Sequence, residues 1–169
     1  IGRNGAGKST LLNIVTEVSE PDAGEVMILP WTRIGSVAQH EVLPSGATTQ
    51  DYLEARSGKQ SWEVAKLASR FALSATELAM PPSTLSGGYQ MRVKLVAMLL
   101  LDPNLLILDE PVNYLDVPTQ MLLERFLKNF DGGFLLTSHD REFLQNTCDF
   151  TIEVERGKIT SYPGGVEEY

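Results

Sequence analysis

The sequence has very little cysteine, no long apolar run and no excess of basic residues. Cys148 is the only cysteine among 169 residues, which excludes an internal disulfide and fits a reducing compartment such as the cytoplasm. The apolar stretch from 95 to 108 is interrupted by Asp102-Pro103-Asn104, so we expect no insertion into a membrane. A formal net charge of -8 argues against binding nucleic acid as a simple basic body.

The composition, 43% hydrophobic and 21% charged, is that of an ordinary globular protein, and 169 residues suit one domain. The chain starts at Ile1 without an initiator methionine and enters a glycine-rich loop at once. Such a loop normally follows an apolar strand. We therefore expect the sequence to be a piece of a longer chain.

The amino-terminal loop carries the strongest motif. Residues 2 to 9 follow the pattern of glycine, four residues, glycine, lysine and serine that defines a phosphate-binding loop. Its glycines let backbone N–H groups surround an anion, and the following helix, from Ser9 to about Val18, adds its positive end. Lys8 suits the β- and γ-phosphates and Ser9 suits Mg²⁺. The residues predicted to bind nucleotide are Gly2, Asn4, Gly5, Ala6, Gly7, Lys8, Ser9 and Thr10.

Two strands are predicted next, at 25–29 and 33–38, and the second ends in Gln39. A glutamine beside a phosphate site could contact Mg²⁺ or the attacking water, although most such side chains are simply solvated. The segment 40–84 then reads as a small helical insertion, with helices at 49–55, 61–71 and 75–78.

A second candidate anion site precedes another helix, predicted at 91–101. Ser86, Gly87 and Gly88 offer exposed N–H groups at a helix start, without obstruction by side chains. One nucleotide needs one such loop. Two loops imply either two ligands or a dimer in which each loop serves the nucleotide of its partner.

The central strand, from Leu105 to Leu108, stops on Asp109 and Glu110. A continuous apolar run fits a parallel strand buried on both faces, and ligands bind at the carboxyl ends of such strands. The two acids could hold a metal ion and activate a water, or they could cap a helix. A second buried strand, at 134–138, delivers His139 to the same edge as a γ-phosphate sensor or as a structural histidine.

The remaining elements are helices at 118–130 and 141–148 and a hairpin formed by 150–155 and 158–162.

Together these motifs resemble the ATP-binding cassette (ABC) ATPases. The matches are Gly2 to Ser9 for the Walker A loop, Gln39 for the Q-loop, Leu85, Ser86, Gly87, Gly88, Tyr89 and Gln90 for the signature, Leu105 to Glu110 for Walker B, Leu115 and Asp116 for the D-loop, and His139 for the switch.

The resemblance implies a P-loop, RecA-like α/β core with a mostly parallel sheet (1–39 and 96–169) and an inserted helical subdomain (40–95). It also implies that the signature acts in trans, with ATP and Mg²⁺ held between this cassette and a second one from the same full-length chain or a homodimer. Glu110 would be the general base, with His139 and Gln39 completing the catalytic set. Ser9, Gln39 and Asp109 would face the metal.

Within the family, the sequence is most similar to the ABC-F group, whose members carry two cassettes and act on the ribosome. The residues that carry this likeness are 109–116, 138–144 and 162–165. It departs from the group at Val112, where threonine is usual, and in the short stretch between Gln39 and Leu85, which has no room for a long helical arm. The ABC-F reading implies a ribosome or ribosomal RNA partner and a role in translation or antibiotic protection. The alternatives are the ATPase subunit of a transporter with a permease partner, and a nucleotide-binding module that hydrolyses little alone.

Overall fold

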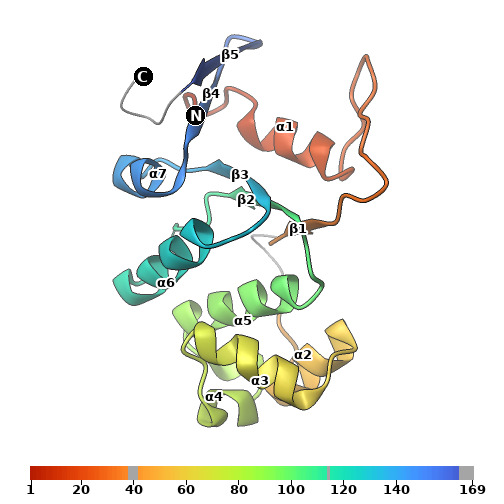
Figure 1. The fold of residues 1–169 in the computed structure, drawn as a ribbon, viewed down its shortest axis with the longest axis vertical. Helices are drawn as coiled ribbons and strands as arrows, with labels where there is room; N and C mark the ends of the chain where they lie inside the picture. The colour runs from red at the N-terminus through yellow and green to blue at the C-terminus, as the bar shows by residue number, and fades with distance from the viewer. Residues whose placement is uncertain (38–41, 114, 164–169) are drawn as a thin grey trace.

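The computed structural model describes residues 1–37, 42–113 and 115–163 (Figure 1). Its elements follow one another as α1 (Lys8–Val15), β1 (Ile34–Ser36), α2 (Thr49–Ser57), α3 (Ser61–Arg70), α4 (Ala75–Ala79), η1 (Pro82–Thr84), α5 (Gly87–Leu99), β2 (Leu105–Asp109), α6 (Val117–Lys128), β3 (Gly133–Thr137), α7 (Arg141–Thr147), β4 (Phe150–Glu155) and β5 (Lys158–Pro163). The α/β class predicted from the sequence is confirmed.

A parallel sheet of order β1-β2-β3 lies in the middle of the fold. Its central strand β2 buries Leu106, Ile107 and Leu108 to 3% exposure or less, as expected for a strand covered on both faces. In Figure 1, α1 lies on one side of this sheet, and α5 lies on the other with α2, α3 and α4. Asp109 pairs in register with Thr137 of β3, so both side chains lie at the carboxyl edge.

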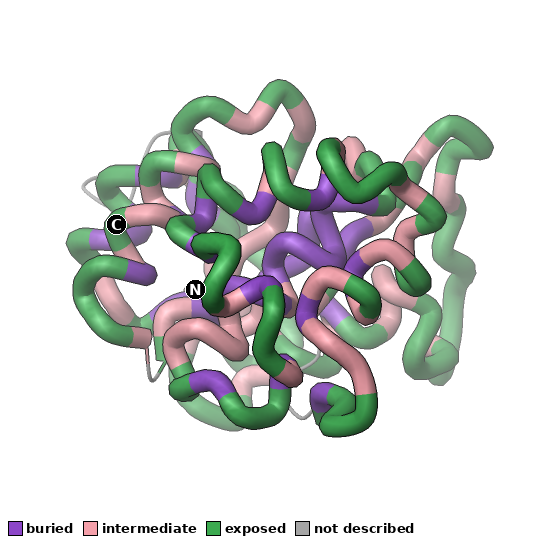
Figure 2. The backbone as a smooth tube through the Cα atoms, turned by 90° about the horizontal axis from the view of Figure 1, so that it is seen from below, coloured by how far each residue is buried: buried purple, intermediate pink, exposed green. Residues whose placement is uncertain are grey.

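The helical region packs on the sheet through α5. Val93, Val96 and Ala97 of α5 are buried to 1% exposure or less, in one apolar cluster with Leu53 and Val64 from the preceding helices and with residues of β2. Figure 2 shows the buried residues gathered in the centre of the molecule. None of the helices in the described segments is long and apolar enough to span a membrane.

The carboxyl-terminal hairpin β4-β5 is antiparallel and turns at Arg156 and Gly157, both with positive φ, as the sequence predicts. Ile1 joins its edge: the amino group of Ile1 donates to Ile152 O at 2.6 Å, and Val154 N donates to Ile1 O at 2.9 Å. The glycine-rich loop is therefore fixed at its start by β4.

One strand prediction is wrong. Residues 25–29 are not a strand but an extended segment with exposed apolar side chains, Met27 at 80% and Leu29 at 48%. A strand needs a neighbour to exchange backbone hydrogen bonds, and no described strand pairs with this segment.

Several boundaries also differ from prediction. Helix α1 begins at Lys8 and ends at Val15, because the chain turns at Glu17 with a φ of 59°. Strand β1 is limited to three residues, and Ala38 lies outside the described residues. Helix α5 begins four residues early, at Gly87, and ends at Leu99. The predicted domain boundary at residue 95 thus falls inside α5.

Candidate active site

The carboxyl ends of β2 and β3 bring the two central acids together with Thr137. The Thr137 hydroxyl donates to Asp109 Oδ1, while Glu110 N donates to Thr137 O at 3.0 Å and lies 3.1 Å from Thr137 Oγ1. Glu110 has a φ of 49°, in the left-handed region, where a non-glycine residue costs about 1–3 kcal/mol and persists only if its surroundings hold it. The bonds to Thr137 provide that support.

Glu110 and His139 face each other across the strand ends. His139 Nε2 lies 3.4 Å from Glu110 Oε1, and His139 N donates to Glu110 Oε2 at 3.3 Å. The Glu110 side chain is 12% exposed and that of His139 is 56% exposed. Among the described residues, no hydrogen bond satisfies the buried Oε1 atom. A buried carboxylate oxygen without a donor is suited to accept a hydrogen bond or a proton from a bound water.

The glycine-rich loop lies against β4 and turns into α1. Gly2 has a φ of 144°, and a Cβ there would lie 2.3 Å from Val154 O, so only glycine fits between loop and hairpin. Gly7, the N-cap of α1, has a φ of 100°. Lys8 Nζ donates to Gly2 O at 2.7 Å and to Arg3 O at 3.2 Å, which folds its ammonium over the loop.

The loop and the switch histidine line one polar cavity of about 420 Å³. Gly2, Arg3 and Asn4 form one wall, and Ser138, His139 and Arg141 form another. The structure therefore places the start of the Walker A loop beside His139, as a nucleotide site requires.

Helix α1 offers an open amino end. Its N-cap Gly7 makes no side-chain cap, and no acid stands in its first turn. Ser9 and Thr10 are exposed there. The first N–H groups of a helix lack partners within the helix, so this end remains available to an anion.

The signature residues lie at the start of α5. Ser86 and Gly87 are exposed, whereas Leu85 is 8% exposed and anchors the loop in the core. Gln90 Nε2 donates to Leu85 O at 2.8 Å and to Ser83 O at 3.2 Å, so its amide holds the loop of its own chain. Helix α5 also lacks a side-chain cap and a first-turn acid. In Figure 1 it lies across the sheet from α1, so the two predicted anion sites are on different sides.

Asp116 of the D-loop caps α6. Its Oδ1 accepts a hydrogen bond from Thr119 N at 2.9 Å. Hydrogen bonds from Thr119, assisted by the charge of Arg92, lower the pKa of Asp116 below its usual 3.8. Leu115 is partly buried against the core. The D-loop thus has its apolar residue packed inside and its acid at the surface.

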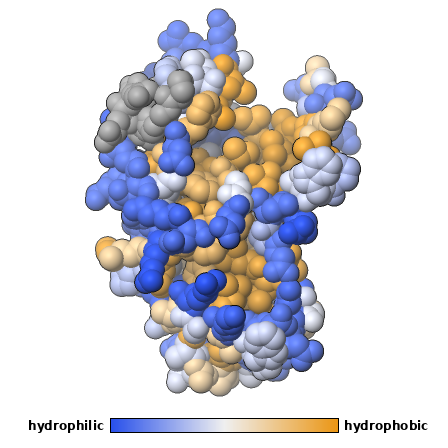
Figure 3. Space-filling view, viewed as in Figure 1, coloured by the Kyte–Doolittle hydropathy of each residue, from blue (hydrophilic) through white to orange (hydrophobic). Residues whose placement is uncertain are grey.

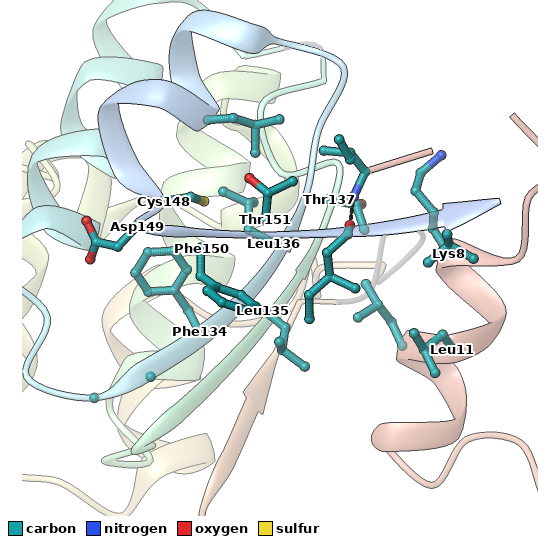
Figure 4. A pocket seen from close by; sticks show the side chains of 17 residues that line it. Lys8, Leu11, Phe134, Leu135, Leu136, Thr137, Cys148, Asp149, Phe150 and Thr151 are labelled. Carbon is teal, nitrogen blue, oxygen red and sulfur yellow. Dashed lines mark hydrogen bonds between the residues drawn. The ribbon is translucent and has the colours of Figure 1, made fainter. Parts of the chain in front are cut away.

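An apolar cavity of about 400 Å³ lies between α1, β3 and β4, and it borders this chemistry, because Lys8 and Thr137 are among its lining residues (Figure 4). Leu11, Leu135, Phe150 and Ile152 are among its lining residues, and Lys8 reaches its edge. Figure 3 shows apolar surface in the middle of the side seen in Figure 1, between hydrophilic borders. Cys148 also lines the cavity, and burial raises the pKa of this thiol. We assign this cavity to packing between the strands, because most of its lining residues are apolar.

Two predicted metal ligands can be placed. Asp109 and Ser9 supply a carboxylate and a hydroxyl, oxygen donors of the type Mg²⁺ prefers. Within the described residues, no cluster of three or more His, Cys, Asp or Glu could hold a metal. This donor set fits an ion that takes few protein ligands and completes its shell with phosphate and water. Gln39, predicted for the same site, lies outside the described residues.

Sequence reasoning missed two residues that hold the site. Thr137 links both acids and could have been found, because it ends the strand just before the switch loop. Arg92 is 6% exposed and bonds to Thr119 Oγ1 at 2.8 Å. In the sequence, Arg92 is a single arginine within the apolar run of α5. A charged residue in such a run is normally predicted to lie at the surface.

Comparison with known proteins agrees with this geometry. The family model described as ABC transporter matches residues 1–113. ATP-binding protein Uup of Buchnera aphidicola subsp. Schizaphis graminum is 37% identical over 178 residues, covering 100% of this chain and 30% of its own. Protein GCN20 of Saccharomyces cerevisiae is 36% identical, covering 100% of this chain and 23% of its own. Ribosome protection protein VmlR of Bacillus subtilis is 35% identical, covering 94% and 29%.

The chain spans less than a third of the length of these relatives. Among solved structures, an ATP-binding subunit of an ABC transporter superposes with a TM-score of 0.84 at 25% identity, covering 99% of this chain and 78% of its own. A dimeric ATP-binding cassette in a post-hydrolysis state with ADP and phosphate gives 0.74 at 24% identity and shows the fold alone, covering 96% and 82%. The chain therefore belongs to the ATP-binding cassette (ABC) family, and it is similar to members of that family's F group.

Proposed function

We propose that this domain binds and hydrolyses Mg-ATP at a site completed by a second cassette. The observation that supports it most is the buried Oε1 of Glu110 at the carboxyl edge of β2, which accepts no hydrogen bond among the described residues and lies 3.4 Å from His139 Nε2. The Walker A loop lines the same polar cavity as His139. The contact of Glu110 with His139, and the cavity that His139 shares with residues 2 to 4, support a site formed by these three parts.

The residues divide the work as follows. The N–H groups at the start of α1, including those of Gly7, Lys8 and Ser9, cradle the phosphates, and Lys8 turns from its own loop carbonyls to the β- and γ-phosphates. Glu110 orients the attacking water and accepts its proton, and His139 stabilises charge on the γ-phosphoryl oxygens. Asp109 and Ser9 hold Mg²⁺, which neutralises phosphate charge when bound.

The second cassette supplies the other phosphate site. Ser86 and Gly87 are exposed at an uncapped helix end on the opposite side of the sheet from α1, so they serve a nucleotide held by a partner. The partner is another cassette of the same long chain or a second copy. Gln90 contributes by holding the Leu85 carbonyl, which keeps the loop in shape.

In the whole protein, we infer that hydrolysis is coupled to the ribosome, in translation or antibiotic protection, and takes place in the cytoplasm. The support is the similarity to GCN20 and to a protein named for ribosome protection. The transporter alternative is supported by a solved subunit at 25% identity, whereas the curated relatives match at 35–37%. Co-sedimentation of the full-length protein with ribosomes in the presence of ATP would separate the two, since a transporter subunit would instead co-purify with a permease.

The catalytic assignment is tested with Glu110→Gln. We expect turnover to fall by about 10²- to 10⁴-fold, because a neutral amide keeps the size of the side chain but cannot accept the proton. Affinity for Mg-ATP, measured by calorimetry, should stay near that of the parent. Glu142→Gln, an exposed carboxylate on α7, is the matched control and should keep parental turnover. Parental turnover in the Glu110 variant would overturn the assignment.

A further inference from the structure

Among the described residues, Arg92 is the only charged residue that is buried. Its side chain is 7% exposed and projects from α5, one turn beyond the signature glycines. Taking a guanidinium out of water is costly unless it is paired and hydrogen-bonded. An apolar residue would pack at this position without that cost, so the charge needs an explanation other than packing.

The contacts of Arg92 join its own helix, α5, to the D-loop and the start of α6. Its Nε donates to Thr119 Oγ1 of α6 at 2.8 Å, and Nη2 lies 3.7 Å from Asp116 Oδ1 of the D-loop. Its guanidinium carbon is 4.7 Å from the centroid of the Tyr89 ring, within the signature. One planar side chain therefore joins the signature helix to the D-loop and to the start of α6.

Gly88 brings the same two elements into direct contact. A Cβ at this residue would lie 3.1 to 3.3 Å from the carboxylate atoms of Asp116, so the backbone of the signature lies against that carboxylate. A Cβ at Gly87 would meet nothing within 4 Å. Gly88 of the signature therefore packs against the D-loop, whereas Gly87 has free space around its Cα atom.

We propose that Arg92 is a positioning residue that fixes Asp116 against the start of α5, so that signature and D-loop approach a partner cassette as one rigid unit. This rests on the proposed function, in which both elements act across the cassette pair. Without Arg92, the two elements would each have to be ordered when the cassettes meet. The loss would then appear in the paired, hydrolysing state and not in nucleotide binding by one cassette.

The test compares Arg92→Met with Arg92→Lys, Asp116→Asn and the double variant of Arg92→Met with Asp116→Asn. Lys94→Met is the matched control, since it removes one positive charge from a partly buried position of the same helix. Three quantities are measured for each: the Kd for Mg-ATP by calorimetry, the dependence of phosphate release on protein concentration, and the melting temperature.

We expect Arg92→Met to keep the Kd within about 2-fold while lowering turnover at saturating ATP about 10-fold, the range of typical coupling between sites. Arg92→Lys should recover part of the activity, because an ammonium can reach either Asp116 or Thr119 but lacks the planar fork that reaches both. The double variant should be no slower than Arg92→Met, since both substitutions break one interaction. Lys94→Met should behave like the parent.

Parental turnover of Arg92→Met, or losses that add in the double variant, would overturn the proposal. If the Arg92→Met variant is unfolded at the assay temperature, Arg92→Lys and Asp116→Asn provide the test. Parental turnover in both of these variants would reject the proposal. Failure of the ATPase assignment is distinguishable, because it would appear as parental turnover in Glu110→Gln whatever Arg92 does.

Discussion

Two kinds of helix start occur in this domain. Five helices close their amino ends with their own carboxylates: Asp51 in α2, Glu63 in α3, Glu77 in α4, Asp116 in α6 and Asp140 in α7. In α1 and α5, both wholly within the described residues, no side-chain cap forms and no acid stands in the first turn. These two helices follow the Walker A loop and the signature. We infer that these two helix ends, which have no anion of their own, are the ones that bind phosphate.

The largest expected effect comes from closing α1. Thr10→Glu places an acid in the first turn, at the position that Asp51, Glu63 and Glu77 occupy in their helices. Two unit charges about 4 Å apart repel by about 4 kcal/mol at an effective dielectric constant near 20, so affinity for Mg-ATP should fall roughly 100-fold or more.

Calorimetry with Mg-ATP measures this loss, and Thr10→Gln is the control of equal size. The melting temperature of the Glu variant should not fall, because an acid at a helix start is favourable for the helix itself. Equal affinities for the Glu and Gln variants would show that α1 does not face the phosphates.

A smaller effect is expected from closing α5. Gly87→Asp adds an acid where a Cβ meets no atom within 4 Å, so the fold should accept it. The acid would repel a nucleotide held by the partner cassette and not the one held by its own Walker A loop. We expect turnover to fall about 10-fold while the Kd for Mg-ATP changes by less than about 2-fold.

Gly87→Ala provides the control for size without charge. The two measurements are phosphate release over a series of protein concentrations and calorimetry on the same samples. A larger Kd for Mg-ATP with unchanged turnover per bound nucleotide would contradict the assignment of α1 to the cassette's own nucleotide and of α5 to that of the partner.

The smallest effect is expected at a capped helix. Ser74→Ala removes the cap of α4 and should cost about 1 kcal/mol, a fall in melting temperature of about 2–4 °C for a domain of this size. Nucleotide affinity should not change. Hydrogen bonds from Ser74 lower the pKa of Glu77 below its usual 4.5. This stabilisation is therefore complete above pH 4.5 and is lost as the pH falls through the folded-state pKa.

Urea unfolding of parent and variant at pH 7 and at pH 3 checks both statements. The difference in the free energy of unfolding between the parent and Ser74→Ala should be smaller at the lower pH, because protonation of Glu77 removes the stabilisation that its carboxylate obtains from the hydrogen bonds of Ser74. A gap that widened in acid would show that Glu77 is not the group involved.

The parts of this fold that could be predicted from sequence are those with local causes. The run Leu105 to Leu108 between a turn and two acids fixes β2, and the hairpin follows from Arg156 and Gly157. Residues 25–29 show the limit, since a short apolar run says nothing about whether a neighbouring strand is present to pair with it.

The candidate site shows the same division. Glycine spacing around Lys8 and the acids at 109 and 110 are visible in sequence because the motif residues are adjacent. Thr137 and Arg92 were missed because their partners are 28 and 24 positions away, at Asp109 and Asp116, and contact only after β3 and α6 have packed. The Q-loop prediction at Gln39 stays a prediction.

The left-handed backbone at Glu110 has a consequence for how such domains diverge. Glycine and asparagine adopt this conformation more easily than glutamate does, so either replacement relieves the local strain while it removes the carboxylate. Loss of chemistry at this position therefore does not threaten the fold. A duplicated cassette is one substitution from a stable descendant that still captures nucleotide without consuming it, and selection could retain such a copy as a sensor of ATP.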